Sequence, residues 1–245
     1  MLCNPFSIET TRSETGLQLE VERAAFRDFV MQQEFPCLGA RAAFNSGAYA
    51  LSVYGELASD VSTTELAHDL FEFTRSEIRD ASEYATFIAV FRQPEQMDEA
   101  QFEIMLWQQL GKLNDADSTH FRWDPDVRSD PADPQFSFSF AGQALYVIGL
   151  HASSSRRARQ FPWPAMIFNP HEQFERLRTD GKWKRMQQTI RARDLALQGS
   201  INPMLSDFGE ATEARQYSGR AVEADWRAPF AAAEPAKNGK CPFGH

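Results

Sequence analysis

The sequence predicts a single α+β domain in which helices pack against a mostly antiparallel central sheet. Three observations support this fold class. Apolar residues recur at helical spacing in several stretches, short aromatic and β-branched runs separate those stretches, and turn residues join neighbouring runs. No glycine-rich phosphate loop follows a predicted strand and no internal repeat is visible, so a nucleotide-binding fold is not supported.

The N-terminal region predicts a helix followed by a hairpin. Apolar residues between Leu17 and Met31 recur at helical spacing, and this pattern stops before the Phe-Pro-Cys motif at 35–37. Residues 40–57 alternate in hydrophobicity around Tyr49, and the run Asn-Ser-Gly at 45–47 is typical of a turn. We therefore expect two strands within 40–57.

The next region predicts helix, strand and helix. Residues 62–65, Ser-Thr-Thr-Glu, have the spacing of a capping box, and a helix is expected from about 64 to 82. Residues 86–91 form a short aromatic and β-branched run, typical of a buried strand that Pro94 ends. A second amphipathic helix is expected from about 98 to 113.

A second hairpin is predicted after a surface loop. Residues 114–134 are rich in Asp and Pro, as surface loops are. Phe alternates with Ser over 136–140, the Ala-Gly pair at 141–142 favours a turn, and 145–150 is an apolar return strand. We expect this hairpin in the middle of the sheet.

The C-terminal region predicts a strand, a long helix and a tail. Residues 165–168 are a short apolar strand, and 171–197 is charged and free of proline, with a possible break at Gly181. From about residue 227 the chain is rich in Ala, Pro, Lys and Gly, so a poorly ordered tail is expected. Residues 1–245 are interpreted as one domain.

Charge and composition limit the classes of partner. The chain carries 25 basic and 34 acidic residues, a net charge of −9, which disfavours nucleic acid and anionic membranes and is compatible with a small cationic ligand. Phe occurs 20 times among 245 residues, which indicates a folded core and also suits an apolar cofactor pocket, although an aromatic core is the commoner explanation.

The cysteines and the hydropathy pattern indicate the compartment. Cys3, Cys37 and Cys241 are widely spaced and show no paired spacing of a zinc site or redox dithiol, so a reducing compartment is expected. No run approaches the roughly 20 apolar residues of a membrane span, and no signal peptide precedes the domain. The sequence thus predicts a cytoplasmic protein.

Two histidines stand out by position. His151 ends the predicted strand 145–150, and His171 lies where a strand passes into a helix. Imidazole is a common ligand of haem iron, and arginine forks bind carboxylates such as haem propionates. The residues that follow His151 and could serve that purpose are Ser154, Ser155, Arg156 and Arg159. Taken alone, such residues are more often a backbone-bonded histidine and an ordinary loop.

A series of motifs, in one order, resembles the YqcI/YcgG family. They are FPC at 35–37, GLH at 149–151 with SSRRAR at 154–159, FNPHEQFERLR at 168–178, IRARD at 190–194, QGSINP at 198–203, DFGE at 207–210, EARQYSGR at 213–220 and CPF at 241–243. The resemblance spans residues 35–243 and rests on several uncommon runs. It implies a haem-dependent N-hydroxylase, similar to those of the guanitoxin and D-cycloserine pathways, which act on guanidine or amine nitrogens.

The resemblance also implies the cofactor chemistry. We expect haem b, dioxygen and an external electron donor, of ferredoxin or flavodoxin type, as the protein would supply ligation and orientation. His151 is the first choice of axial ligand because the hydroxyl and arginine run lies beside it. His171 is the alternative, or lies on the opposite haem face. Cys37 and Cys241 rank below both, because free cysteines are usually inert.

A cationic substrate, similar to arginine or lysine, requires carboxylates aimed at its charge. The acidic residues of the matching motifs are Glu172, Glu175, Asp207, Glu210 and Glu213. We prefer Asp207 and Glu210, since they lie in a short glycine-containing segment between predicted elements. Tyr217 could donate a hydrogen bond to bound oxygen, although a satisfied interior tyrosine is the commoner case.

Two other functions remain open from the sequence. One is a haem-binding sensor or carrier that uses the same histidine and arginines without substrate turnover. The other is a metal-free enzyme or binding module in which His151, His171 and the arginines hold an anionic ligand.

Overall fold

The computed structural model describes residues 4–6, 16–80, 82–206 and 209–233. Its strands are β1 (Tyr49–Glu56), β2 (Thr86–Gln93), β3 (Phe138–Phe140), β4 (Gln143–Leu150) and β5 (Ala165–Pro170). Its α-helices are α1 (Gly16–Met31), α2 (Leu38–Ser46), α3 (Asp60–Thr74), α4 (Glu77–Asp80), α5 (Glu99–Asp117), α6 (His171–Thr179), α7 (Trp183–Gln198) and α8 (Ala214–Tyr217), and a 3-10 helix, η1, spans Arg157–Arg159.

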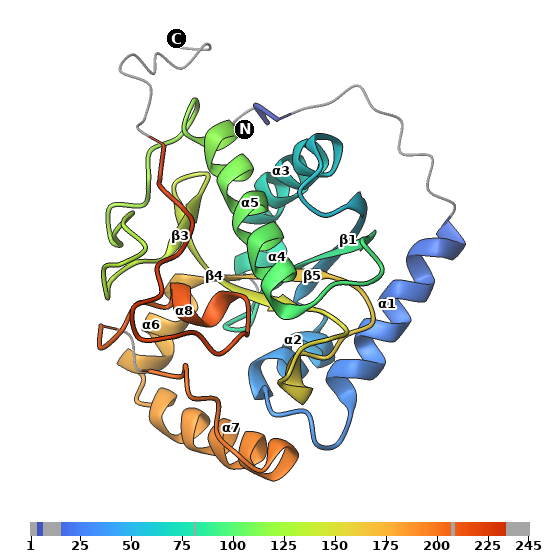
Figure 1. Ribbon diagram of the computed structural model, residues 1–245, viewed down its shortest axis with the longest axis vertical. Coiled ribbons are helices and arrows are strands. Elements are labelled where there is room, and N and C mark those ends of the chain that lie inside the picture. The colour runs from blue at the N-terminus through green and yellow to red at the C-terminus, as the bar shows by residue number, and fades with distance from the viewer. Residues whose placement is uncertain (1–3, 7–15, 81, 207–208, 234–245) are drawn as a thin grey trace.

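These elements form one α+β domain, as the sequence predicts. The strands make a single five-stranded sheet in the order β1-β2-β5-β4-β3. Only β1 and β2 run parallel, while β2 with β5, β5 with β4 and β4 with β3 are antiparallel. Figure 1 shows helices on both sides of this sheet, with α3 and α5 on one side and α1 and α2 on the other.

Side-chain alternation along the strands divides the interior into two clusters. On β4, Leu145 and Val147 belong to the cluster beneath α3 and α5, whereas Leu150 belongs to the cluster beneath α1 and α2. Gly149 faces α5 so closely that an added Cβ would lie 2.5 Å from a ring atom of Phe102. Since both faces are covered by helices, each strand has one set of side chains in each cluster.

Two predictions are wrong: the first strand of the hairpin expected within 40–57, and the place of the second hairpin in the middle of the sheet. Residues 38–46 form α2 rather than a hairpin strand, because Cys37 Sγ caps its start by accepting from the Ala40 amide at 3.4 Å. Gly47, with φ of 73°, ends that helix in the left-handed conformation, so the Asn-Ser-Gly run is a C-cap. The β3–β4 hairpin lies at one edge of the sheet, and β5 takes the middle.

Helix boundaries also differ from those predicted. The N-cap of α3 is Ser59, whose side chain accepts from the Ser62 amide, so the expected capping box at 62–65 lies inside the helix. The possible break at Gly181 is confirmed: its φ of 70° separates α6 from α7. Residues 228–233, expected in a poorly ordered tail, lie along the core, whereas 234–245 are outside the described residues.

A buried carboxyl joins α5 to the β3–β4 turn. Asp117, at the end of α5, accepts a hydrogen bond from the Ala141 amide at 2.8 Å. Ala141 and Gly142 have φ of 54° and 73°, the two positive values that a tight hairpin turn requires. Because burial removes water from the Asp117 side chain, its pKa rises to about 7.

This raised pKa makes stability depend on pH. Between about pH 4 and pH 7, an unfolded chain releases the Asp117 proton and the folded chain retains it, so the unfolding free energy falls as pH rises. The decrease in unfolding free energy over this range should be on the order of 4 kcal/mol. Asp117→Asn keeps a side-chain oxygen that can accept from the Ala141 amide but has no proton to release, so this decrease should disappear.

Urea unfolding across that pH range, with the exposed Asp115→Asn as a control on the same helix, measures the effect. Parallel curves for the wild type and Asp117→Asn would contradict it.

Candidate functional site

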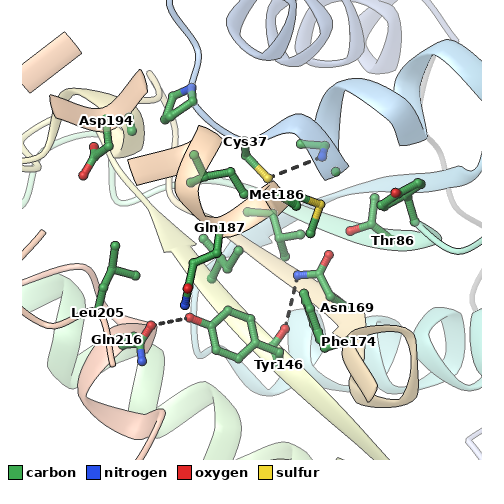
Figure 2. A pocket seen from close by; sticks show the side chains of 18 of the residues that line it. Cys37, Thr86, Tyr146, Asn169, Phe174, Met186, Gln187, Asp194, Leu205 and Gln216 are labelled. Atoms are coloured by element: carbon green, nitrogen blue, oxygen red, sulfur yellow. Dashed lines mark hydrogen bonds between the residues drawn. The ribbon is translucent and has the colours of Figure 1, made fainter. Parts of the chain in front are cut away.

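A cavity of about 300 Å³ lies between the sheet and helices α1, α2, α6 and α7 (Figure 2). Its volume is at the lower end of the range for small-molecule pockets. Most of its lining is apolar or aromatic. The uncharged polar and thiol groups that line it are those of Cys37, Tyr84, Thr86, Tyr146, Asn169, Gln173, Gln187, Asn202, Ser206 and Gln216.

His171 lines this cavity as the first residue of α6. Pro170 ends β5 immediately before it, so the central strand delivers the imidazole to the cavity wall. The side chain is buried, with Nε2 3.4 Å from Glu175 Oε1 and Nδ1 3.9 Å from Glu213 Oε2. Burial lowers the pKa of His171 despite the opposing effect of Glu175, which favours the neutral imidazole.

Two buried carboxyl groups line the cavity: Asp194, which pairs with Arg156, and Glu213. Glu213 directly precedes α8, is 6% exposed, and accepts a hydrogen bond from the Tyr217 hydroxyl at 2.5 Å. Burial raises the pKa of Glu213 to about 8, since the charged form loses its hydration. The sequence places Glu213 among five acidic candidates, but only burial distinguishes it from the others.

Three of the other acidic candidates, Asp207, Glu210 and Glu172, have no described contact with the cavity. Glu210 is exposed and does not line the cavity, and Asp207 is outside the described residues. Glu172 pairs at the surface with Arg79 and Arg176, at 2.8 and 2.7 Å. The preference for Asp207 and Glu210 as substrate carboxylates therefore receives no geometric support from the described part of the chain.

Tyr217 positions Glu213 from behind the cavity wall. Its hydroxyl donates to Glu213 and accepts from the Phe138 amide at 3.0 Å, and its ring stacks on Trp107 at 5.6 Å between centroids. Tyr217 is fully buried and does not line the cavity. Of the two roles that the sequence left open for Tyr217, this geometry matches the interior tyrosine whose hydroxyl is fully hydrogen-bonded.

Tyr146 is a cavity residue that the sequence analysis did not select. Its hydroxyl donates to Gln216 Oε1 at 2.8 Å, and its backbone oxygen accepts from Asn169 at 3.3 Å. Figure 2 shows Gln187 of α7 beside Tyr146. The alternation of side chains along β4 could have identified Tyr146 from the sequence. Tyr146 shares one face of the strand with Ile148 and Leu150, which also line the cavity.

His151 lies on the other side of the sheet. It is 1% exposed, does not line the cavity, and stacks on Phe102 of α5 at 4.5 Å between centroids. Successive residues of a strand point to opposite faces of the sheet. Because Leu150 points to the side of α1 and α2, His151 points to the side of α5. Neither ring nitrogen has a hydrogen-bond partner among the described residues, and burial lowers the pKa of His151.

The residues after His151 hold the surrounding segments together. Arg156 is buried and binds Asp194 of α7 at 2.6 Å and the Ser200 carbonyl at 2.9 Å. Arg159 donates to the carbonyl oxygens of Gly149, Gln216 and Tyr217 at 2.8 to 3.1 Å. Both arginines border the cavity, but these bonds direct their guanidinium groups toward protein acceptors.

The two serines make local contacts. Ser154 Oγ accepts from the Arg156 amide at 3.3 Å, and Ser155 donates through its amide and hydroxyl to Glu99 at 2.7 and 2.8 Å. Ser154 is buried and Ser155 exposed, and neither lines the cavity. The run 154–159 thus connects α5, α7 and α8.

A metal site of several ligands and a membrane-spanning helix each require features that the described residues lack. Among them, no cluster of three or more His, Cys, Asp or Glu side chains has the arrangement of a metal site. No helix there has the length and apolar character needed to cross a membrane.

Comparison with known proteins finds a family and two relatives. A model of the YqcI/YcgG family matches residues 26–231. The uncharacterized protein YcgG of Bacillus subtilis (strain 168) is 27% identical over 218 residues, which cover 86% of this chain and 81% of YcgG. The uncharacterized protein YqcI of the same organism is 26% identical over 219 residues, with the same shares covered. No solved structure matches.

The Arg156–Asp194 pair yields a stability prediction. Removing one partner of a buried ion pair leaves the other charge uncompensated, so Arg156→Ala should lower the unfolding free energy by about 3–5 kcal/mol. The neighbouring Arg157 is exposed, and Arg157→Ala should cost less than about 1 kcal/mol. Chemical denaturation of the three proteins measures both values, and equal small losses would argue against a holding role for Arg156.

Proposed function

The chain belongs to the YqcI/YcgG family, and from this premise we propose that it is a haem-dependent oxygenase that hydroxylates an amine or guanidine nitrogen of a small cationic substrate. One observation carries the proposal: a mainly apolar cavity holds a buried imidazole, His171, and a buried carboxyl, Glu213, on the same wall. The first group can ligate iron and the second can bind a cation.

The donor set of the cavity fits a haem. His171 is the only histidine among the residues that line it, and its pKa, lowered by burial, leaves the nitrogen lone pair available at neutral pH. Cys37 also lines the cavity, but burial raises the pKa of its thiol and disfavours the thiolate that would bind iron. His171 therefore replaces His151 as the residue that would hold the haem iron.

Other arginines suit the propionate role better than those first chosen. Arg156 and Arg159 bind groups that join α7 and α8 to the sheet, whereas Arg178 of α6, which pairs with Glu175, and Arg191 of α7 line the cavity on its helical side. A guanidinium can bind a carboxylate through two parallel charge-assisted hydrogen bonds. We assign Arg178 and Arg191 to the haem carboxylates.

When bound, the haem would supply dioxygen chemistry in which one oxygen atom enters the substrate nitrogen and the other leaves as water, with two electrons and two protons from outside. The protein's own residues do the rest. Glu213 would oppose the positive charge of the substrate, and Tyr217 fixes one oxygen of Glu213 through its hydroxyl. The aromatic lining would exclude bulk water and strengthen that charge pair.

Glu213 also separates this proposal from its two rivals. A haem sensor or carrier has no need of a carboxyl that is 6% exposed inside the cavity and costly to desolvate. An anionic ligand would instead pair with the arginines that line the cavity, and it would leave Glu213 in its uncharged form. The cationic substrate is the ligand whose charge complements Glu213.

The ligand assignment predicts different spectra for two histidine variants. Reconstitution with haem should give the wild type a Soret band that shifts with dithionite and carbon monoxide. His171→Ala should lose this band, because it removes the cavity imidazole. His151→Ala should retain it, because that side chain lies across the sheet.

Circular dichroism of both haem-free variants controls for folding. The reverse pattern would restore His151 as ligand, and a wild type without a Soret band would remove the haem proposal altogether.

The carboxyl assignment predicts a substrate-binding defect. Glu213→Gln should retain the Soret band and weaken binding of an arginine- or lysine-like substrate at least about 30-fold, since an unopposed buried charge costs about 2–5 kcal/mol. The exposed Glu210→Gln is the matched control and should bind normally.

Mass spectrometry for the gain of one oxygen, with arginine, lysine and related guanidines and a reductant supplied, tests turnover by each protein. Normal turnover by Glu213→Gln would place the substrate charge elsewhere.

A further inference from the structure

Positive charge is concentrated in one segment of this acidic chain. Residues 176–193, the end of α6 and most of α7, contain seven basic residues and one acidic residue, whereas the remainder of the chain contains 18 basic and 33 acidic residues. A net-negative protein thus has one strongly basic segment, and it lies on two helices that border the cavity.

Several of these basic side chains pair with other groups of the protein, but Lys184 and Arg185 have no side-chain partner among the described residues. Arg178 pairs with Glu175, and Lys182 pairs with Glu83 at 3.1 Å. Lys184 and Arg185 are exposed, and no ion pair within the described ranges involves either of them. Their charges are therefore directed to solvent.

Helix stability does not explain Lys184 and Arg185. Both lie in the first turn of α7, where the helix dipole favours acidic side chains and disfavours basic ones. The first turn contains no acidic residue, and the N-cap, Lys182, makes no side-chain capping hydrogen bond. The basic residues at this position oppose the local electrostatics, so a role outside the helix is favoured.

Two exposed apolar side chains lie toward the other end of α7. Leu195 of α7 and Ile201 just beyond it are 47% and 43% exposed. Arg157, which is exposed, donates to the Leu197 carbonyl at 3.0 Å and adds a basic group at this end. Exposed apolar residues with charged residues around them are the usual composition of a protein interface.

The opposite face of α7 forms part of the cavity wall. Trp183, Met186, Gln187 and Ile190 line the cavity at helical spacing, while Lys184 and Arg185 face outward. Figure 1 shows α7 at the periphery of the molecule, and a helix with its side chains is about 10–12 Å across. The basic surface and the cavity are thus separated by a single helix.

We propose that the outer face of α7, centred on Lys184 and Arg185 with Leu195 and Ile201, docks a small acidic electron-transfer protein that carries a flavin or an iron–sulfur cluster. The inference rests on the haem assignment above. At each docking the carrier would lose one electron and the bound haem would gain it, so two dockings would supply the two electrons of a turnover. An acidic carrier complements this basic surface, whereas a second copy of the chain that docked through the same face of α7 would present like charge to it.

The first experiment measures docking without haem chemistry. Oxidised flavodoxin, a small acidic flavoprotein, is titrated at low ionic strength into the wild type, Lys184→Glu/Arg185→Glu and a control, Arg122→Glu/Arg128→Glu, whose residues are exposed on the loop before β3. The wild type and the control should bind with similar, salt-sensitive affinity. The Lys184→Glu/Arg185→Glu variant should bind at least about tenfold more weakly.

The second experiment measures electron delivery to the haem-loaded proteins. Reduction by reduced flavodoxin should be at least about tenfold slower for Lys184→Glu/Arg185→Glu than for the control. Reduction by dithionite should be equal for both. The variant should unfold at the same temperature as the wild type or slightly higher, because acidic residues suit the first turn of α7.

Equal flavodoxin binding by all three proteins would overturn the docking surface. So would wild-type binding of duplex DNA or phosphatidylserine vesicles, lost in Lys184→Glu/Arg185→Glu, without flavodoxin binding. If the wild type takes up no haem, the function proposed above fails, while the titration with oxidised flavodoxin still decides the docking surface.

Discussion

The separation of two core clusters by one sheet, covered on both faces, is the constraint on which the rest of the structure depends. Side chains along β4 alternate between the cluster under α5 and the side of the cavity, so Tyr146 and Leu150 reach the cavity whereas His151 stacks on Phe102. β5 occupies the middle of this sheet. The chain leaves β5 directly into α6, which brings His171 to the cavity wall from the central strand of the sheet.

The charged groups around the cavity differ in role according to their polar contacts. Arg159 binds three backbone carbonyls and Arg156 binds Asp194, and these contacts secure α7 and α8 against the sheet. That framework leaves Glu213 buried and hydrogen-bonded to Tyr217. The functional proposal therefore depends on structural arginines near the cavity as well as on the groups that line it, because they hold the helices that close it.

Local sequence signals predicted the elements whose formation depends on local energetics. The helix of α5, the strand β2 and the break at Gly181 follow from hydrophobic period, β-branched content and backbone freedom, and each occurs. Residues 38–46 were predicted as a strand of a hairpin and form α2 instead. Short apolar runs are ambiguous, and here capping by Cys37 and Gly47 favours the helix.

For the site, the sequence by itself determined the α+β class, the family resemblance and a short set of histidines and acidic residues. Only the tertiary structure decided among them. His151 and His171 each follow a strand and cannot be ranked by spacing, yet one lies across the sheet from the cavity and the other lines it. Glu213 differs from Glu210 only in burial, which depends on how α8 packs against β4. Burial and cavity formation arise from contacts between segments far apart in the chain, and local patterns do not encode those contacts.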